Sequence, residues 1–370
     1  MMRRPNPSAS ACTCSPVVCF ILPPDVLERV AREGGDEDRQ AAMKTLAASS
    51  GMRARRSVVG NVLRELNVPL ADVPFLALPK GERRTVYDVE GGGSFDLPGK
   101  KVRGEGDPPS DDESVNEAYD GADKTYDLYK EVYGRDSLDD RGMELISSVH
   151  YGVDFDNAFW QGSQMVYGDG SGRIFAKGGL TKAVDVIGHE MTHGVVQFTA
   201  GLIYRKQSGA LNESFADVMG SLVKQYSRDQ SADEADWILG EGILGPALNG
   251  KGLRSLKEPG TAYEGDRQPG HMDDYVDLPD DNDPSNDNGG VHINSGIPNR
   301  AFQLAATAIG GKAWEKAGQI WYTTLTSKLD ANAQFVPTAE ATVEVAGELF
   351  GSGSDEETAV RQAWEEVGVL

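Results

Sequence analysis

The first part of the chain shows two short amphipathic patterns separated by a break. Apolar side chains in residues 25–48 recur at helical spacing, and Gly34-Gly35 interrupts them, which predicts two short helices. The basic cluster Arg53-Ala54-Arg55-Arg56 follows, and we interpret it as an exposed processing site. We therefore expect residues 1–56 to form a separate segment, with a boundary that could extend to about residue 84.

The rest of the chain changes from strand-like to helix-like periodicity. Between residues 83 and 177 the apolar runs are short and separated by turns, which predicts strands, with one helix at 114–133. From Thr181 onward helical spacing dominates, with loops at 255–290 and around Gly351. Strands followed by helices indicate an α+β protein rather than alternating α/β units.

This order predicts two lobes. We place a β-rich lobe at residues 83–200 and an α-helical lobe at 201–370. Residues 1–56 carry more Lys and Arg than Asp and Glu, whereas the whole chain has a net charge of −22. Opposite charges favour docking of the first segment on the acidic lobes, and the alternative is a loosely attached tail.

Charge and hydropathy also narrow the classes of partner. A strongly acidic surface repels nucleic acid phosphates and anionic lipid, so we expect neither nucleic acid nor a membrane as a partner. The longest apolar run near the N-terminus extends from Val17 to Leu22 and is closed by Pro23 and Pro24. This run is too short for a membrane span or an ordinary signal peptide.

The clearest chemical signal is a histidine pair in the stretch TKAVDVIGHEMTHGVVQFT. His189 and His193 are spaced i, i+4, which places both imidazoles on one face of a helix, one turn apart. Glu190 lies between them in sequence and points to the side, where it can take a proton from a metal-bound water. The alternative is two surface histidines on an amphipathic helix.

A second helical stretch supplies carboxylates at the same spacing. Glu213 and Asp217 in GALNESFAD share one helix face. A catalytic zinc ion held by two His and one Glu keeps one position for water, so Glu213 is the expected third ligand. Asp217 is placed to accept the proton on the second nitrogen of a ligating His, which fixes its tautomer.

Several stretches, taken together, resemble the thermolysin family of zinc endopeptidases. The resemblance covers residues 83–370 and rests on HEMTH, NESFAD, NAFWQGSQMVYGDG, GLIY and DNGGVHINSG. It implies a two-lobe fold with the zinc site in the cleft between the lobes. The leader CFILPPDVLERVAREG, with Pro23-Pro24, resembles the short propeptide of the protealysin-type branch. This resemblance implies a proenzyme in which residues 1–56 act as an intramolecular inhibitor.

The resemblance also assigns roles to single residues. It implies that Glu190 is the general base of peptide hydrolysis, with Tyr204 and His292 as hydrogen-bond donors to the developing oxyanion. Asp287 would orient His292, and Asn212 joins Asp217 beside the metal ligands. The groups expected to bind the peptide backbone are Asn157, Ala158 and Arg254. The apolar residues expected to line a pocket for a large hydrophobic residue after the cut are Phe175, Leu180, Val186, Leu239 and Leu253.

The family's paired calcium site is only partly retained. Asp185, Asp236 and Glu241 remain as acids, but Lys224 stands where thermolysin has an acid and Ile238 replaces another. We expect the Lys224 ammonium to replace one calcium ion and to leave at most one calcium site, beside one catalytic zinc ion.

The cysteines leave two interpretations open. Cys12, Cys14 and Cys19 all lie in the first segment, so no disulfide is expected within the lobes. One of them could reach the metal as a thiolate, or all three could belong to an inert leader. The absence of an ordinary export signal leaves secretion by another route and cytoplasmic residence open, and the resemblance favours secretion.

Two other functions compete with an endopeptidase acting on peptide and protein substrates as a monomer. A zinc aminopeptidase normally carries a Gly-x-Met-Glu-Asn motif, which this sequence lacks. A latent zinc-bound binding module has no need of a general base, so the presence of Glu190 disfavours it.

Overall fold

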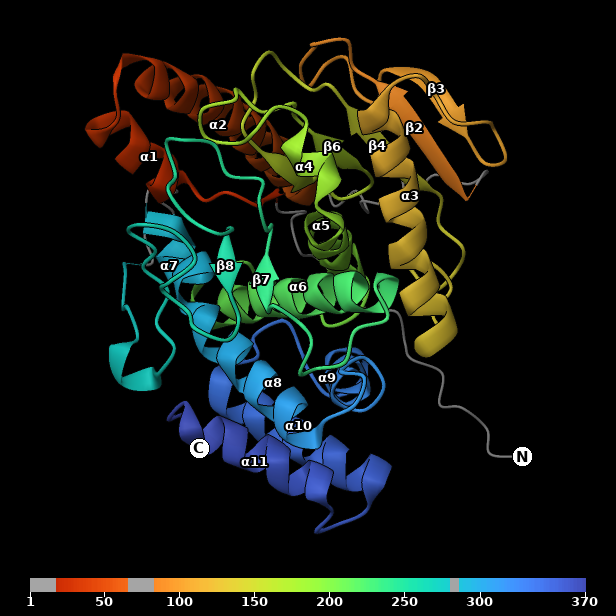
Figure 1. Cartoon of the computed structure of the whole chain (residues 1–370), viewed down its shortest axis with the longest axis vertical. Coiled ribbons are helices and arrows are strands. Elements are labelled where there is room, and N and C mark those ends of the chain that lie inside the picture. Colours follow the sequence, from red (N-terminus) through yellow and green to blue (C-terminus); the bar gives the residue numbers. More distant parts are fainter. Residues whose placement is uncertain (1–17, 66–82, 280–285) are drawn as a thin grey trace.

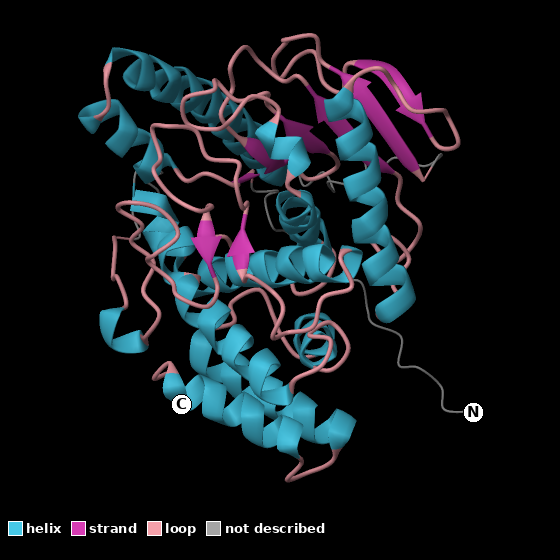
Figure 2. Cartoon of the chain, viewed as in Figure 1, coloured by secondary structure: helices cyan, strands magenta, loops and turns pink. Residues whose placement is uncertain are grey.

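The computed structural model describes residues 18–65, 83–279 and 286–370, and for residues 53–65 it describes the backbone alone. A mixed β-sheet lies at one end and a cluster of helices at the other, with α5 and α6 crossing between them (Figures 1 and 2). The predicted α+β fold with a β-rich part followed by an α-helical part is confirmed. Cys12 and Cys14 lie outside the described residues.

Most of the described strands lie before residue 170, and helices predominate after it. The strands are β1 (Cys19–Phe20), β2 (Arg84–Asp88), β3 (Lys100–Gly104), β4 (Leu145–Val149), β5 (Ala158–Trp160), β6 (Met165–Tyr167), β7 (Ile238–Leu239) and β8 (Arg254–Ser255). The α-helices are α1 (Pro24–Glu33), α2 (Asp36–Glu65), α3 (Glu113–Asp127), α4 (Gly179–Lys182), α5 (Val184–Gln197), α6 (Lys206–Ser227), α7 (Asp287–Asn294), α8 (Gly296–Ile309), α9 (Ala317–Ser327), α10 (Phe335–Phe350) and α11 (Asp355–Glu366). A π-helical turn, Leu128–Val132, extends α3, and a 3₁₀ turn covers Met272–Asp274.

The main sheet has the order β1-β5-β6-β4-β2-β3. The pairs β2–β4 and β4–β6 are parallel, and the other pairs are antiparallel. The edge strand β1 comes from the first segment of the chain, with Cys19 opposite Trp160 and Phe20 opposite Phe159. The first segment thus completes a sheet of the β-rich part and is no loose tail.

The first segment differs from the sequence prediction in the length of its second helix. The predicted break falls at Gly34-Gly35, between α1 and α2, but α2 has 30 residues and continues far beyond residue 48. The basic cluster at 53–56 lies within α2, and its side chains are outside the description. Apolar residues of α1, including Val26 and Leu27, belong to the same buried cluster as the lobes.

Helices α5 and α6 cross closely at glycines, which sets the position of the histidine pair. A Cβ atom on Gly220 would lie 2.4 Å from the carbonyl oxygen of Asp185, and one on Gly188 would lie 3.0 Å from Val223. Nearly all of α5 is buried, as expected for a helix that is apolar on most of its surface. The close crossing brings the middle of α5 against the first half of α6.

A half-buried histidine links the start of α3 to the loop after β6. His150 Nδ1 lies 2.7 Å from Asp169 Oδ1, and its Nε2 lies 2.8 Å from Asp112 Oδ2. The hydrogen bond to Asp169, opposed by burial and reinforced by Asp112, raises the pKa of His150 to about 9. Asp112 also caps α3 by accepting hydrogen bonds from the amides of Ser114 and Val115.

This cluster predicts that the protein loses stability as the pH rises above neutrality. The folded state keeps the His150 proton between the unfolded pKa of about 6.5 and the folded value of about 9. Its contribution is therefore complete below about pH 6.5 and is lost as the pH rises to about 9. We expect a loss on the order of 1–2 kcal/mol in the free energy of unfolding, because solvent partly screens the group. Urea titrations across that range measure it.

The substitution His150→Asn should flatten this pH dependence. Asn tolerates the left-handed backbone that His150 adopts at φ 57°, so the change removes the titrating group without adding backbone strain. His271→Asn is the matched control and should keep the slope of the parent. An unchanged slope in His150→Asn would show that another group carries the pH dependence.

Candidate active site

Three buried side chains from α5 and α6 bring their ligand atoms together. The Nε2 atoms of His189 and His193 are 3.1 Å apart. Glu213 Oε2 lies 3.5 Å from the first of them, and Glu213 Oε1 lies 3.5 Å from the second. Ligand atoms about 2.0–2.1 Å from a tetrahedral zinc ion are about 3.3 Å from one another. The spacing of these atoms therefore fits a zinc ion.

The partners of the other ring nitrogens favour a set of metal ligands over a hydrogen-bonded pair of histidines. His193 Nδ1 lies 2.8 Å from Asn212 Oδ1, and His189 Nδ1 lies 2.8 Å from Asp217 Oδ1. Both Nδ1 atoms lie within hydrogen-bond distance of an acceptor oxygen, which favours the tautomers that carry the hydrogen on Nδ1 and the lone pair on Nε2. Two lone pairs that face each other need a cation between them, and Glu213 Oε2 likewise has no hydrogen-bond partner among the described residues.

Burial and neighbouring charges keep these groups in the protonation states that metal binding requires. Burial, as the largest effect, lowers the pKa of His193 to about 4, so its imidazole is neutral. Burial raises the pKa of Asp217, but the guanidinium of Arg254 and the hydrogen bond from His189 outweigh it and hold that pKa well below the usual range. Arg254 Nε lies 2.9 Å from both carboxylate oxygens of Asp217.

Glu190 lies beside this cluster with one oxygen unused. Its Oε2 accepts a hydrogen bond of 2.9 Å from the amide of Trp160, whereas its Oε1 has no hydrogen-bond partner in the described part of the chain. Burial, reinforced by the charge of Glu213, raises the pKa of Glu190 well above that of an exposed glutamate. A carboxylate whose proton affinity is increased in this way suits a general base.

His292 and Tyr204 lie on the opposite side of the cluster. His292 Nδ1 is 2.5 Å from Asp287 Oδ1, and its Nε2 is 2.9 Å from the carbonyl oxygen of Phe20. Both nitrogens face oxygen acceptors, so the ring is an imidazolium. Burial lowers the pKa of His292, but Glu213 and Asp287 raise it more, to about 9.

The hydroxyl of Tyr204 joins the same group of donors. It donates a hydrogen bond to Glu213 Oε1 and lies 3.2 Å from His292 Nε2. Tyr204 is buried, and burial raises its pKa well above 10, so it is a neutral donor. The structure thus brings both expected oxyanion donors beside the expected metal ligands.

The expected backbone-binding groups all hold the first segment of this chain. Asn157 pairs with Leu22, its Oδ1 accepting from the amide and its Nδ2 donating to the carbonyl, each at 3.0 Å. The amide of Ile21 donates to the carbonyl of Ala158 at 3.1 Å. Arg254 Nη1 donates to the carbonyl of Ile21 at 3.0 Å. The segment therefore lies along β5 as an added strand.

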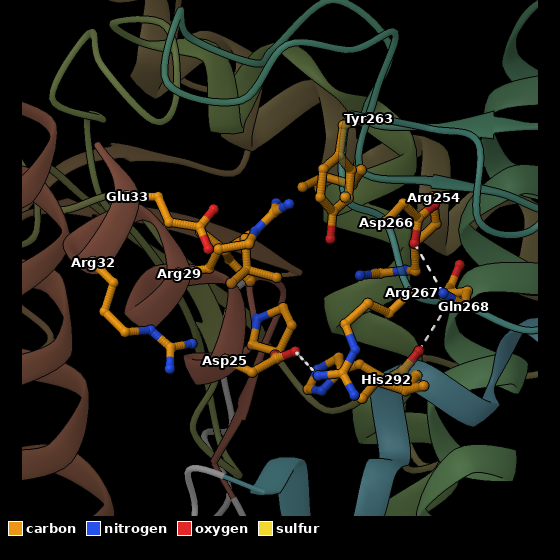
Figure 3. A pocket seen from close by; sticks show the side chains of 16 residues that line it. Asp25, Arg29, Arg32, Glu33, Arg254, Tyr263, Asp266, Arg267, Gln268 and His292 are labelled. Carbon is orange, nitrogen blue, oxygen red and sulfur yellow. Dashed lines mark hydrogen bonds and ion pairs between the residues drawn. The ribbon is translucent and has the colours of Figure 1, made fainter. Parts of the chain in front are cut away.

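Helix α1 follows directly and docks on a loop of the α-helical part. Side chains of α1 and of the loop face each other across a pocket (Figure 3). Arg29 Nη1 donates to the carbonyl of Glu264 at 2.7 Å, and its guanidinium lies 5.5 Å from the ring centre of Tyr263. Arg267 pairs with Asp25 at 3.6 Å. The first segment therefore contacts both β5 of the β-rich part and the loop at residues 263–267 of the α-helical part.

The five predicted pocket residues are all buried in one cluster. Leu22 and Ile21 of the first segment belong to the same cluster. At most 2% of each pocket residue is exposed: Phe175, Leu180, Val186, Leu239 and Leu253. Their apolar surface is therefore covered in this structure.

A buried lysine lies between two of the acids that were expected to bind calcium. Lys224 Nζ lies 3.1 Å from Asp185 Oδ2 and 2.9 Å from Asp236 Oδ1, and it donates to the carbonyl of Ile238 at 2.6 Å. Glu241 is exposed. The Lys224 ammonium thus lies between the carboxylates of Asp185 and Asp236.

Several residues of the site carry no sequence motif of their own. Asn299 Nδ2 donates to Asp217 Oδ2 at 2.8 Å, and Gln268 Nε2 donates to the carbonyl of His292 at 2.7 Å. The amide of Trp160 holds Glu190 through the backbone, which no side-chain pattern reveals. Cys19, the cysteine within the described residues, lies beside the expected metal ligands His193 and Glu213.

Two histidines, a glutamate, a buried base and two oxyanion donors define a zinc peptidase of the His-His-Glu class. A comparison with known protein families agrees with this class of peptidase. Residues 77–197 match the model of the thermolysin metallopeptidase catalytic domain, and residues 200–369 match that of the thermolysin metallopeptidase α-helical domain. The chain belongs to the thermolysin family of metallopeptidases.

The similar proteins include both secreted enzymes and a precursor. The chain is 46% identical over 359 residues to the "Extracellular metalloprotease" of Pectobacterium carotovorum subsp. carotovorum, covering 95% of this chain and 96% of the relative. It is 44% identical over 355 residues to "Protease PrtS" of Photorhabdus sp. (strain Az29), covering 94% and 91%.

A solved structure of a precursor is also similar. The precursor of protealysin, a metalloproteinase from Serratia proteamaculans, superposes with a TM-score of 0.81 at 46% identity and covers 95% of this chain and 100% of that chain. This chain is accordingly a zinc-dependent metallopeptidase made as a proenzyme.

Proposed function

We propose that this protein is a neutral endopeptidase with one catalytic zinc ion held by His189, His193 and Glu213. The separation of their ligand atoms, 3.1 Å to 3.5 Å, carries the proposal, because these distances fit a tetrahedral ion. Asp217 and Asn212 fix the tautomers of the two histidines. We place the propeptide at residues 1–56, with its end no later than about residue 84, the β-rich lobe at 83–200 and the α-helical lobe at 201–370.

The side chains around the metal then have separate roles in peptide hydrolysis. The zinc ion supplies Lewis acidity for an attacking water and for the carbonyl oxygen. Glu190 Oε1 takes the proton of the attacking water and passes it to the leaving amine. Tyr204 and His292, held by Asp287, donate hydrogen bonds to the oxygen that becomes negative.

The backbone contacts of the propeptide indicate how a peptide substrate binds. Asn157 and Ala158 pair with the substrate as an added strand, and Arg254 donates to one of its carbonyl oxygens. The residue after the cut enters an apolar pocket, so we expect cleavage before large hydrophobic residues. The pocket is lined by Phe175, Leu180, Val186, Leu239 and Leu253.

Two further proposals concern calcium and location. Lys224 replaces one calcium ion beside Asp185 and Asp236, which leaves at most one calcium site, near Glu241. We propose secretion, which the names of the extracellular relatives support, and a monomer that acts on peptides and proteins. No described helix combines the length and apolarity that a bilayer crossing requires.

Casein hydrolysis tests the proposed function. The full-length protein should be latent until its propeptide is cut, and a zinc chelator should abolish the activity of the cut form. Readdition of zinc should restore it. A cut protein that binds one zinc ion and leaves casein intact would instead be a binding module.

The substitution His292→Ala should lower kcat and leave the metal in place. Removal of one oxyanion donor costs on the order of 10² in kcat, whereas the three metal ligands are untouched. Zinc content should stay at one ion per chain, and KM should change less than kcat. His271→Ala is the control, because His271 lies outside the site. Loss of zinc from His292→Ala would mean that His292 supports the metal.

A further inference from the structure

Cys19 is the residue of the propeptide strand that faces the metal ligands. Its side chain is 4% exposed and packs with Tyr204 and Val291. The next residue, Phe20, packs in a different cluster, against the ring of Phe159 at 5.0 Å. Successive side chains of a strand point to opposite faces, so the pairing of β1 with β5 directs the sulfur into the site.

The sulfur lies in the same space as two proposed zinc ligands. Cys19 Sγ and ligand atoms of His193 and Glu213 all lie within 4.8 Å of one another, and all three residues are buried. Glu213 Oε2 is a fully buried acceptor that finds no hydrogen-bond partner among the residues that the structure describes, and it lies 3.5 Å from His189 Nε2. A thiolate is a preferred zinc ligand, and three protein ligands leave a fourth position on a catalytic zinc ion.

The propeptide backbone contacts the same groups that we propose to bind the backbone of a substrate. The carbonyl of Phe20 faces His292 Nε2 at 2.9 Å, and that of Ile21 accepts from Arg254 at 3.0 Å. The Phe20–Ile21 bond therefore has the position of a bond to be cut, and a large apolar residue follows it. A working site would cleave this bond unless the attacking water were kept out.

We propose that the Cys19 thiolate is the fourth zinc ligand of the precursor and keeps out the attacking water. The proposal rests on the zinc ligand set of the proposed function. When the sulfur binds, the thiol proton passes to solvent and the water leaves the fourth position. Latency is then sensitive to thiol chemistry, because a reagent that modifies the sulfur removes the ligand and reopens the position.

Cobalt substitution of the full-length precursor tests this ligand directly. Cys12→Ser and Cys14→Ser leave Cys19 as the single thiol of the chain, and Glu190→Gln prevents processing. The Co²⁺ form should show a thiolate-to-cobalt charge-transfer band in the near ultraviolet. Adding Cys19→Ser should remove the band while one cobalt ion per chain stays bound.

Alkylation provides a second readout on the same single-thiol protein. Iodoacetamide forms a carbon–sulfur bond with release of iodide, and it needs a free thiolate. We expect alkylation of Cys19 to be at least about tenfold slower with the metal bound than after chelation, because coordination ties up the sulfur lone pairs. A denatured sample sets the reference rate and shows that the thiol is intact.

The outcomes separate this inference from the proposed function. One bound cobalt ion without the band, a band retained in Cys19→Ser, or equal alkylation rates would overturn the role of Cys19 alone. Failure of the precursor to bind cobalt would overturn the zinc ligand set as well. If Cys19→Ser does not fold, as judged by its melting curve, the band and the alkylation rates of the single-thiol protein decide.

Discussion

The substitution Glu190→Gln should lower the peptidase activity of the processed protein by at least about 10³ and leave zinc binding unchanged. Glutamine keeps the hydrogen bond that Oε2 accepts from Trp160, but it cannot take up a proton at the position of Oε1. General base catalysis contributes about 10²–10⁴ in rate. The loss should appear in kcat more than in KM, because Glu190 does not hold the substrate backbone.

A matched control separates loss of the base from loss of structure. Glu117→Gln changes a partly buried glutamate, whose pKa is raised mainly by burial and which accepts a hydrogen bond from Thr181 away from the expected metal ligands. This variant should keep kcat within about twofold of the parent, as expected for a change outside the site. If Glu190→Gln kept more than a tenth of the parent activity at full zinc content, the base would have to be another group.

The substitution Lys224→Met should destabilise the protein by about 3–5 kcal/mol. Lys224 is 3% exposed and its ammonium contacts Asp185, which is 1% exposed. Removal of the cation leaves a buried carboxylate without its partner, together with the carbonyl of Ile238 that lost its donor. Unfolding by urea in a Glu190→Gln background measures the change without self-digestion.

The surface pair of Lys328 provides the control for this experiment. Lys328 contacts Glu344 at 2.8 Å and Glu348 at 2.7 Å, but all three groups are accessible to water. Lys328→Met should therefore shift the urea midpoint of unfolding far less than Lys224→Met does. Equal effects of Lys224→Met and Lys328→Met would show that the carboxylates of Asp185 and Asp236 are held by something other than Lys224.

The expected metal ligands and their immediate partners could be predicted because their spacing in the sequence places them on common helix faces. His189 and His193 on one helix, and Glu213 and Asp217 on the next, need only the i, i+4 rule to face a common ion. The fold class followed from the change of periodicity near Thr181. The predicted role of Asp217 agrees with its contact with His189 at 2.8 Å.

Other features depend on tertiary contacts that no local pattern encodes. The choice of Cys19 among three cysteines depends on which residues of the propeptide pair with β5, because a shift by one residue would turn the sulfur away. The length of α2 was underestimated because glycine and repeated arginines interrupt its apolar pattern. Asn299 reaches Asp217 from a distant helix, so spacing in sequence gives no sign of it.

An anomalous difference map at the zinc edge, from crystals of the full-length Glu190→Gln precursor, tests the central claim most directly. The account predicts one strong zinc peak bonded to the Nε2 atoms of His189 and His193 and to the carboxylate of Glu213. A peak at other residues, or a zinc-saturated crystal without a peak between α5 and α6, would contradict it.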